Sequence, residues 1–194
     1  MARPQSICVF CGSRRGSDPA LARVAANLGR TLAANGITLV YGAGGIGLMD
    51  VIAQAALDAG GRVTGVMPRH LARKELLKDG LTELHVVETM HDRKRVMFEL
   101  SGAFVALPGG IGTLEEMVEI LSWRQLGIHD KPIVLLNAGG AWDHFEALMR
   151  GRVDAGFCAP SDLELYEVID RVELLLPALD NARPPRIPSF SDWT

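Results

Sequence analysis

The chain has 194 residues, of which 48% are hydrophobic and 22% are charged, a composition typical of one folded domain whose core needs no disulfides or metal ions. Its formal net charge of -3 argues against a nucleic-acid-binding protein, which usually carries a basic face. No apolar run approaches the roughly 20 residues that cross a bilayer, and the N-terminus lacks the apolar stretch of a secretory signal. We therefore expect a cytoplasmic protein with neither nucleic acid nor membrane as a partner.

Short β-type runs alternate with longer amphipathic segments along the chain. The predicted strands cover residues 6–10, 37–41, 62–66, 83–87, 103–107 and 132–136, and the predicted helices cover residues 19–34, 47–59, 90–100, 112–126 and 142–153. Asp18 is expected to cap the first helix, with Pro19 at its first helical position. A last strand–helix pair is expected within residues 165–179.

This alternation predicts an α/β fold with a Rossmann-like, doubly wound parallel sheet. Several of the strand candidates are apolar nearly throughout, as in parallel strands that helices cover on both faces. We expect a single nucleotide-binding domain over residues 1–180, followed by an extended, proline-rich tail over residues 181–194. Because ligands of such sheets bind outside the carboxyl ends of the strands, the segments that follow the strands are the candidate site.

The three cysteines do not predict a disulfide framework, because their number is odd. Cys8 and Cys11 form a C-x-x-C spacing, but they lie at the end of a strand-like run rather than at a helix start, where redox pairs lie. A zinc site would need two more ligands at suitable spacing, and no cluster supplies them. We expect a structural or incidental role for these cysteines and no metal site.

Glycine-rich turns follow three of the predicted strands, at residues 11–17, 41–49 and 108–113. Each alone could be a plain tight turn. Together they favour an anion site, because glycine lets the backbone approach a ligand and the following helix directs unpaired N–H groups at it. Phosphate is the anion that we expect. Neither common phosphate motif fits, since no lysine follows Gly112 and the G-x-G-x-x-G match at residues 42–47 follows the second strand instead of the first.

The basic segment over residues 89–97 opens a predicted helix, which Thr89 and Asp92 are expected to cap. Met90, Arg93 and Met97 then share one face, so Arg93 lies on the stripe that should pack inward. A buried guanidinium needs a carboxylate or phosphate partner, although a purely structural pair would also satisfy it. Lys94 is expected to point elsewhere, toward solvent.

Thr113 and Glu116 allow two interpretations. Thr-x-x-Glu before an apolar run is the sequence form of a capping box, in which neither residue does chemistry. However, a carboxylate repels a bound phosphate, so a site for phosphate alone should avoid one. A ligand with two ends resolves the conflict: the turn holds its phosphate, and Glu116 faces a ribose that becomes positively charged as it loses its base.

The motif Pro-Gly-Gly-x-Gly-Thr-x-x-Glu at residues 108–116, preceded by Met-His-x-Arg-Lys at residues 90–94, resembles the lonely-guy family. The resemblance runs from the first strand to about Asp154. These proteins are cytokinin riboside 5'-monophosphate phosphoribohydrolases, formerly mislabelled lysine decarboxylases. The resemblance implies hydrolysis of the N-glycosidic bond of a nucleoside 5'-monophosphate, AMP included, to the free base and ribose 5-phosphate. It implies no cofactor, and a homodimer or larger assembly.

The family's catalytic arginine and glutamate fall on Arg93 and Glu116. The candidate substrate-binding residues combine the contacts that the resemblance implies with residues of the glycine-rich turns. They are Ser13, Gly44, Glu75, Arg93, Lys94, Gly109, Gly110, Ile111, Gly112, Thr113, Leu114, Glu115, Glu116 and Ser122. Without the resemblance, the mixed-charge run around Glu75 would indicate only a solvated helix.

The chain departs from the family pattern at Ala43 and Asp50, where glycine is common, and at Ser122, where threonine is common. None of these changes removes a candidate catalytic group. Two other functions remain open. A pyridoxal-phosphate decarboxylase would need a lysine placed for a Schiff base, and a non-catalytic carrier, similar to the molybdenum-cofactor carriers that share this fold, would bind nucleotide-like ligands without releasing base.

Overall fold

The computed structural model describes residues 3–72 and 77–185. All seven strands are parallel and form one sheet in the order β4-β3-β2-β1-β5-β6-β7. The strands are β1 (Ser6–Phe10), β2 (Thr38–Tyr41), β3 (Val63–Pro68), β4 (Glu83–Val87), β5 (Ala103–Ala106), β6 (Ile133–Leu136) and β7 (Glu167–Ile169). The helices are α1 (Ala20–Ala34), α2 (Gly47–Asp58), α3 (Arg69–Ala72), α4 (Met90–Glu99), α5 (Ile111–Gln125), α6 (Asp143–Asp154) and α7 (Leu175–Asn181).

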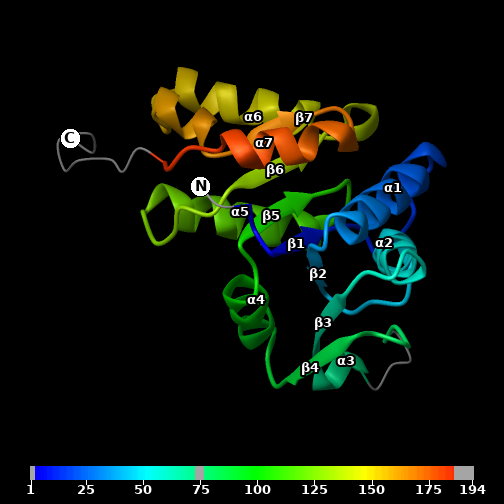
Figure 1. Cartoon of the computed structure of the whole chain (residues 1–194). Coiled ribbons are helices and arrows are strands. Elements are labelled where there is room, and N and C mark those ends of the chain that lie inside the picture. The colour runs from blue at the N-terminus through cyan, green and yellow to red at the C-terminus, as the bar shows by residue number, and fades with distance from the viewer. Residues whose placement is uncertain (1–2, 73–76, 186–194) are drawn as a thin grey trace.

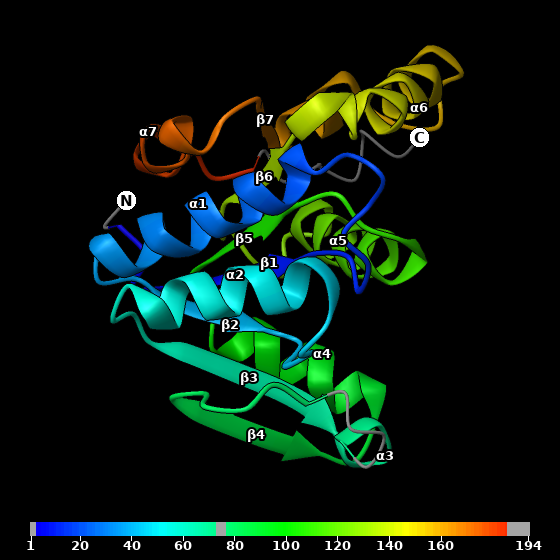
Figure 2. The ribbon, with the colours of Figure 1, turned by 90° about the vertical axis from the view of Figure 1, so that its right-hand side faces the viewer.

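Helices cover both faces of this sheet (Figure 1). Helices α1 and α2 lie in front of the sheet in Figure 2, and α4 and α5 lie behind it. Each face has its own apolar cluster, one with α1, α2 and α7 and the other with α4, α5 and the residues around Trp142. Covering on both faces explains why β1, β3, β5 and β6 are apolar almost throughout.

The strand order reverses between β1 and β5, which are paired from Ile7–Ala103 to Phe10–Ala106. The chain builds β1 to β4 in one direction and then crosses to the other side of β1 to build β5, β6 and β7. Such a switch point opens a crevice at the carboxyl ends of the two central strands. The turns that follow β1 and β5 meet there, and the Gly12 N–H donates to the Pro108 carbonyl at 3.1 Å.

The structure confirms the predicted α/β architecture and the type of every predicted element. The last strand–helix pair is present as β7 and α7. The Asp18 carboxylate accepts from the Ala20 N–H at 2.7 Å, but α1 begins at Ala20 with Pro19 as its N-cap residue, one residue later than predicted. The sequence did not predict α3, which is only one turn long. The predicted tail lies outside the described residues from residue 186 onward.

Candidate active site

A buried ion pair joins two helices at the carboxyl edge of the sheet. Arg93 of α4 donates from Nη1 to Oε1 of Glu116 on α5 at 2.8 Å, and its Nε donates to the Val66 carbonyl at the end of β3 at 3.2 Å. The two side chains are only 12% and 11% exposed. The inward direction that was predicted for Arg93 is confirmed, and its partner is a carboxylate. On the same helix the predicted Thr89 cap is also confirmed, whereas Met90 is exposed instead of buried.

Gly42 makes room for this pair. A Cβ on Gly42 would lie 1.7 Å from Nη2 of Arg93, so any larger residue would force the guanidinium out of its position. A Cβ on Gly109 would likewise lie 2.0 Å from Thr113 Oγ1, and a Cβ on Gly47 would lie 2.2 Å from the Ser13 carbonyl carbon. At these three glycines the close approach in the structure is between parts of the chain itself.

Two other glycines of the third turn do face open space. A Cβ on Gly110 or Gly112 would meet no atom within 4 Å. Helix α5 begins at Ile111 with Gly110 as its N-cap, and the first helical hydrogen bond in this turn runs from the Leu114 N–H to the Gly110 carbonyl at 3.1 Å. The N–H groups before Leu114 thus have no partner within the helix, and they form an anion-binding end beside these glycines.

The capping-box interpretation of Thr113 and Glu116 is wrong. Because α5 begins at Ile111, Thr113 lies inside the first turn, and no side chain caps the helix. Thr113 is buried, and Glu116, one turn further along, pairs with Arg93.

A cavity of about 380 Å³ lies between the three turns and contains the ion pair. Eight candidate residues line it: Ser13, Gly44, Arg93, Gly110, Ile111, Gly112, Thr113 and Glu116. Its other walls are largely apolar, with Ile46, Met49, Met67 and Leu71 among the lining residues. The site therefore combines an apolar wall, a carboxylate and a helix N-terminus, which suits a ligand with an aromatic ring at one end and an anion at the other.

Lys94 does not contribute to this cavity. Its ammonium group donates to Glu115 at 2.5 Å and to Glu119 at 2.9 Å, and its side chain is largely buried between them. The expected solvent-exposed position of Lys94 is wrong, because the carboxylates of α5 cover it.

The remaining candidates are dispersed. Gly109 lines a neighbouring cavity, Leu114 and Glu115 lie on the outer side of α5, and Ser122 is exposed about two turns beyond Thr113. Glu75 lies outside the described residues.

Burial raises the pKa of the Glu116 carboxyl above its ordinary value, while the Arg93 guanidinium opposes that rise. Burial also raises the pKa of the Cys11 thiol, which lines the cavity, and that of Cys8 behind it. Thiols with raised pKa values are poor nucleophiles. This agrees with the structural role that the sequence predicts for both cysteines.

Asp50, one of the departures from the family pattern, forms a local ion pair. Its carboxylate accepts from Lys78 Nζ at 2.7 Å, and the Lys78 backbone N–H donates to the Ala43 carbonyl at 2.9 Å. These contacts hold Lys78, in the segment between α3 and β4, against α2 and the second glycine-rich turn. Ala43 itself is fully buried with a φ of 58°, a left-handed conformation that usually selects glycine. Neither residue lines the cavity, and neither is a partner in the Arg93–Glu116 ion pair.

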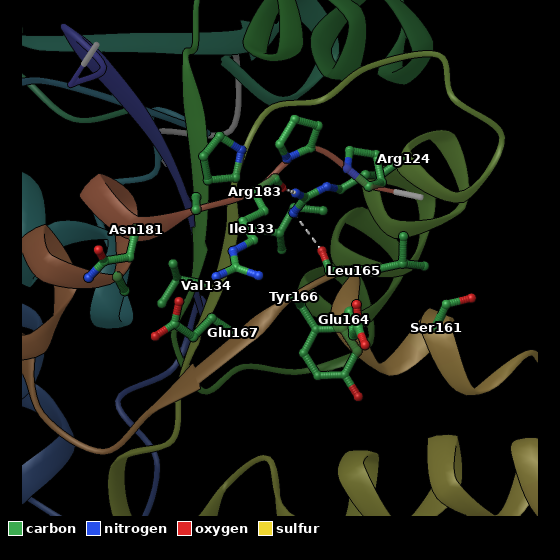
Figure 3. A pocket seen from close by; sticks show the side chains of 15 residues that line it. Arg124, Ile133, Val134, Ser161, Glu164, Leu165, Tyr166, Glu167, Asn181 and Arg183 are labelled. Atoms are coloured by element: carbon green, nitrogen blue, oxygen red, sulfur yellow. Dashed lines mark hydrogen bonds between the residues drawn. The ribbon is translucent and has the colours of Figure 1, made fainter. Parts of the chain in front are cut away.

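Another cavity, of about 250 Å³, lies at the opposite edge of the sheet, beside the start of β6 (Figure 3). Arg124 lines it and donates to the backbone carbonyls of Leu165 and Arg183, each at 2.7 Å. No candidate site residue lines this cavity. These contacts tie the end of α5 to the segment before β7 and to the C-terminal part of the described chain, which is a structural role.

Within residues 3–72 and 77–185, no group of three or more His, Cys, Asp or Glu side chains is arranged to hold a metal ion. No helix of the described chain has the length and hydropathy to span a bilayer.

Solved structures of this fold include two molybdenum-cofactor proteins. The molybdenum cofactor binding protein of Rippkaea orientalis superimposes with a TM-score of 0.68 at 21% identity, over 93% of this chain and 98% of that one. The molybdenum cofactor carrier protein of Chlamydomonas reinhardtii gives a TM-score of 0.68 at 25% identity, over 91% of this chain and 96% of that one. At such identities the likeness supports the fold.

Sequence comparison is more informative. Residues 49–179 match a family model described as "Possible lysine decarboxylase". The chain is 40% identical over 183 residues to the cytokinin riboside 5'-monophosphate phosphoribohydrolase LOG5 of Arabidopsis thaliana, covering 94% of this chain and 80% of that protein. It is 46% identical over 165 residues to the probable cytokinin riboside 5'-monophosphate phosphoribohydrolase LOGL9 of Oryza sativa subsp. japonica, covering 85% and 73%. The family that the motifs suggested is thereby confirmed, and the chain belongs to the lonely-guy family of enzymes.

Proposed function

We propose that this protein hydrolyses the N-glycosidic bond of cytokinin riboside 5'-monophosphates, and of AMP, to give the free base and ribose 5-phosphate. The observation that carries the proposal is the Arg93–Glu116 pair, which lies in one cavity with the open N-terminus of α5. The names of the relatives supply the substrate class. Cytoplasmic location is part of the same proposal.

The substrate fits the cavity in one orientation. The unpaired N–H groups at the start of α5 would bind the 5'-phosphate, because they combine hydrogen-bond donors with the positive end of the helix dipole. The ribose would then lie at Glu116, and the base would lie against the apolar wall that includes Met49 and Met67. This arrangement keeps the carboxylate apart from the phosphate.

Glu116 would act on the sugar. When the bond from C1' to the base breaks, its electron pair leaves with the base, and positive charge develops on C1' and the ring oxygen. A carboxylate held in a cavity of low polarity stabilises that charge, and it can also orient the water whose oxygen then bonds to C1', while one proton of that water passes overall to the departing base. Arg93 holds Glu116 through Nη1 and is itself held by Val66. Its role in this proposal is to position the carboxylate, without any metal ion or cofactor.

The pH dependence should reflect the raised pKa of Glu116. Only the carboxylate stabilises a cation, so kcat/KM should fall as the pH drops through that pKa, at higher pH than about 4.3, the value of an unperturbed glutamate. Glu115 contributes a like charge that helps raise the pKa. Glu115→Gln should therefore move the acid limb of the pH profile to lower pH. An acid limb that stayed in place, or that moved to higher pH, would contradict the assignment of the limb to Glu116.

We also propose a homodimer through the outer face of α5. Ile111, Leu114 and Val118 form an exposed apolar stripe on this helix, and Ser122 continues it. Ser122 faces away from the cavity of its own subunit. Pairing two copies through this stripe would give that hydroxyl access to the neighbouring subunit.

Val118→Asp is expected to convert the dimer into a monomer, because it buries an unpaired charge at the centre of the stripe. Multi-angle light scattering after gel filtration would measure the mass. The matched control is Leu148→Asp, which places the same charge at an exposed leucine of α6. Equal masses for the two variants would refute this interface.

The competing functions differ in their products. A carrier would bind AMP and return it unchanged, whereas the proposed hydrolase converts AMP and isopentenyladenosine monophosphate to free base. For a decarboxylase, no lysine of the described residues lines the cavity: Lys94 is held between two carboxylates, and Lys78 is paired with Asp50. Chromatography of the purified protein incubated with each nucleotide and with lysine tests all three. Intact nucleotide, or carbon dioxide from lysine, would refute the hydrolase.

A further inference from the structure

A second cavity adjoins the candidate active site. It has a volume of about 350 Å³ and shares Ser13 and Gly110 with the active-site cavity. Its walls are the turn after β1, with Arg14 and Arg15, and the turn after β5, with Gly109. A ligand whose phosphate lies at the start of α5 would therefore reach this second cavity directly.

The active site itself offers little positive charge to a phosphate. Arg93 is paired with Glu116, and Lys94 is paired with both Glu115 and Glu119. These two cations face three carboxylates, so the cluster has an excess of one negative charge. A phosphate dianion beside it is repelled unless other cations compensate, since like charges at these distances disfavour one another.

Arg14 and Arg15 can supply that compensation. Both are exposed and line the second cavity, and neither forms an ion pair or a side-chain hydrogen bond within the described residues. Asp50, which lines a surface groove together with Arg15, is already paired with Lys78. The two guanidinium groups thus have donors available for an anion.

The turn that carries these arginines is well fixed. The Gly12 N–H donates to the Pro108 carbonyl at 3.1 Å, and the Gly12 carbonyl accepts from the Leu48 N–H at 3.0 Å. Gly47 packs so closely on this turn that a Cβ there would lie 2.2 Å from the Ser13 carbonyl carbon. A solvated loop would need no such packing. A fixed backbone reduces the entropy that is lost when an arginine binds its ligand.

We propose that Arg14 and Arg15 form the cationic half of the 5'-phosphate site, opposite the N–H groups of α5, and thereby select nucleoside monophosphates over nucleosides. This inference rests on the proposed function for its substrate. Lys94, a candidate substrate-binding residue by the resemblance, is instead held by its ion pairs with Glu115 and Glu119.

The test compares Arg14→Ala/Arg15→Ala with the unsubstituted protein and with Arg62→Ala. Arg62 is a suitable control because it is also exposed and lies just before β3, at the opposite edge of the sheet. For the double variant, KM for AMP should rise about ten- to hundredfold, as expected for the loss of charge-assisted hydrogen bonds, with kcat changed less than about threefold. Arg62→Ala should leave both constants unchanged. Arg14→Lys/Arg15→Lys should recover part of the loss, since lysine retains the charge.

Equilibrium binding separates this inference from the proposed function. In calorimetry, the double variant should bind AMP at least tenfold more weakly but should bind adenosine as the unsubstituted protein does. If the unsubstituted protein releases no base, yet this difference in binding is seen, the proposed reaction fails and the phosphate site stands. If AMP affinity and KM in the double variant stay within twofold of the unsubstituted values, the phosphate site is refuted, whether or not base is released.

Discussion

Glu116→Gln is expected to release base from AMP about 10²–10⁴-fold more slowly than the unsubstituted protein, with KM little changed. The amide has nearly the same shape as the carboxylate but has no charge to stabilise the developing sugar cation. Nothing in the proposed phosphate site is altered, so ground-state binding should persist. Steady-state assays of free base by chromatography would give both constants.

The control for this variant is Glu119→Gln. It removes a carboxylate from the same helix, outside the cavity, and leaves Lys94 paired with Glu115. This variant should retain activity within about threefold, since Glu119 does not line the cavity and Lys94 keeps its contact with Glu115. Thermal unfolding of both variants would show whether either is simply unfolded. A folded Glu116→Gln protein with near-normal kcat would rule out the proposed role of Glu116.

Gly42→Ala is expected to reduce kcat about 10²-fold in a protein that still folds. The added Cβ would lie 1.7 Å from Arg93 Nη2, so the guanidinium must move, and Glu116 loses the contact that positions it. Displacements of about 1 Å at a catalytic group have effects of this size. The substitution changes no residue of the proposed phosphate site and adds or removes no charge, so it tests the positioning role of Arg93 separately.

Gly151→Ala is the matched control for this effect. Gly151 lies in α6, where a Cβ would meet no atom within 4 Å, and alanine there should favour the helix slightly. If Gly42→Ala retained full activity, or lost activity no more than Gly151→Ala, Arg93 would not be needed in its observed position.

The sheet could be predicted from sequence because each parallel strand, covered on both faces, is a continuous apolar run between turns. The same periodicity correctly placed Arg93 on the inward face of α4, since one charged residue on an apolar stripe stands out. Its partner could not be read from periodicity alone. The 2.8 Å contact joins α4 to α5, and such pairings depend on how the helices pack on the sheet.

The errors came from local patterns with more than one physical cause. Thr-x-x-Glu predicts a capping box only if the helix begins at the threonine, and here it begins at Ile111, two residues earlier. Glycine marks close approach, but the sequence does not say whether the neighbour is a ligand or, as at Gly42, an arginine of another helix. Lys94 appeared to be solvated because the two carboxylates that cover it belong to α5. Nothing in the sequence marked Leu71 as a cavity residue, because it lines the cavity only through the position of α3, which follows β3.

In the proposed hydrolase reaction water, and no other acceptor, takes the 5-phosphoribosyl group from the base. The most direct test is the product balance from AMP in phosphate-free buffer, with adenine and ribose 5-phosphate each quantified over a time course. We expect the two products in a one-to-one ratio, at a rate that inorganic phosphate does not increase. Adenine released only when phosphate is added, or without an equal amount of ribose 5-phosphate, would contradict this claim.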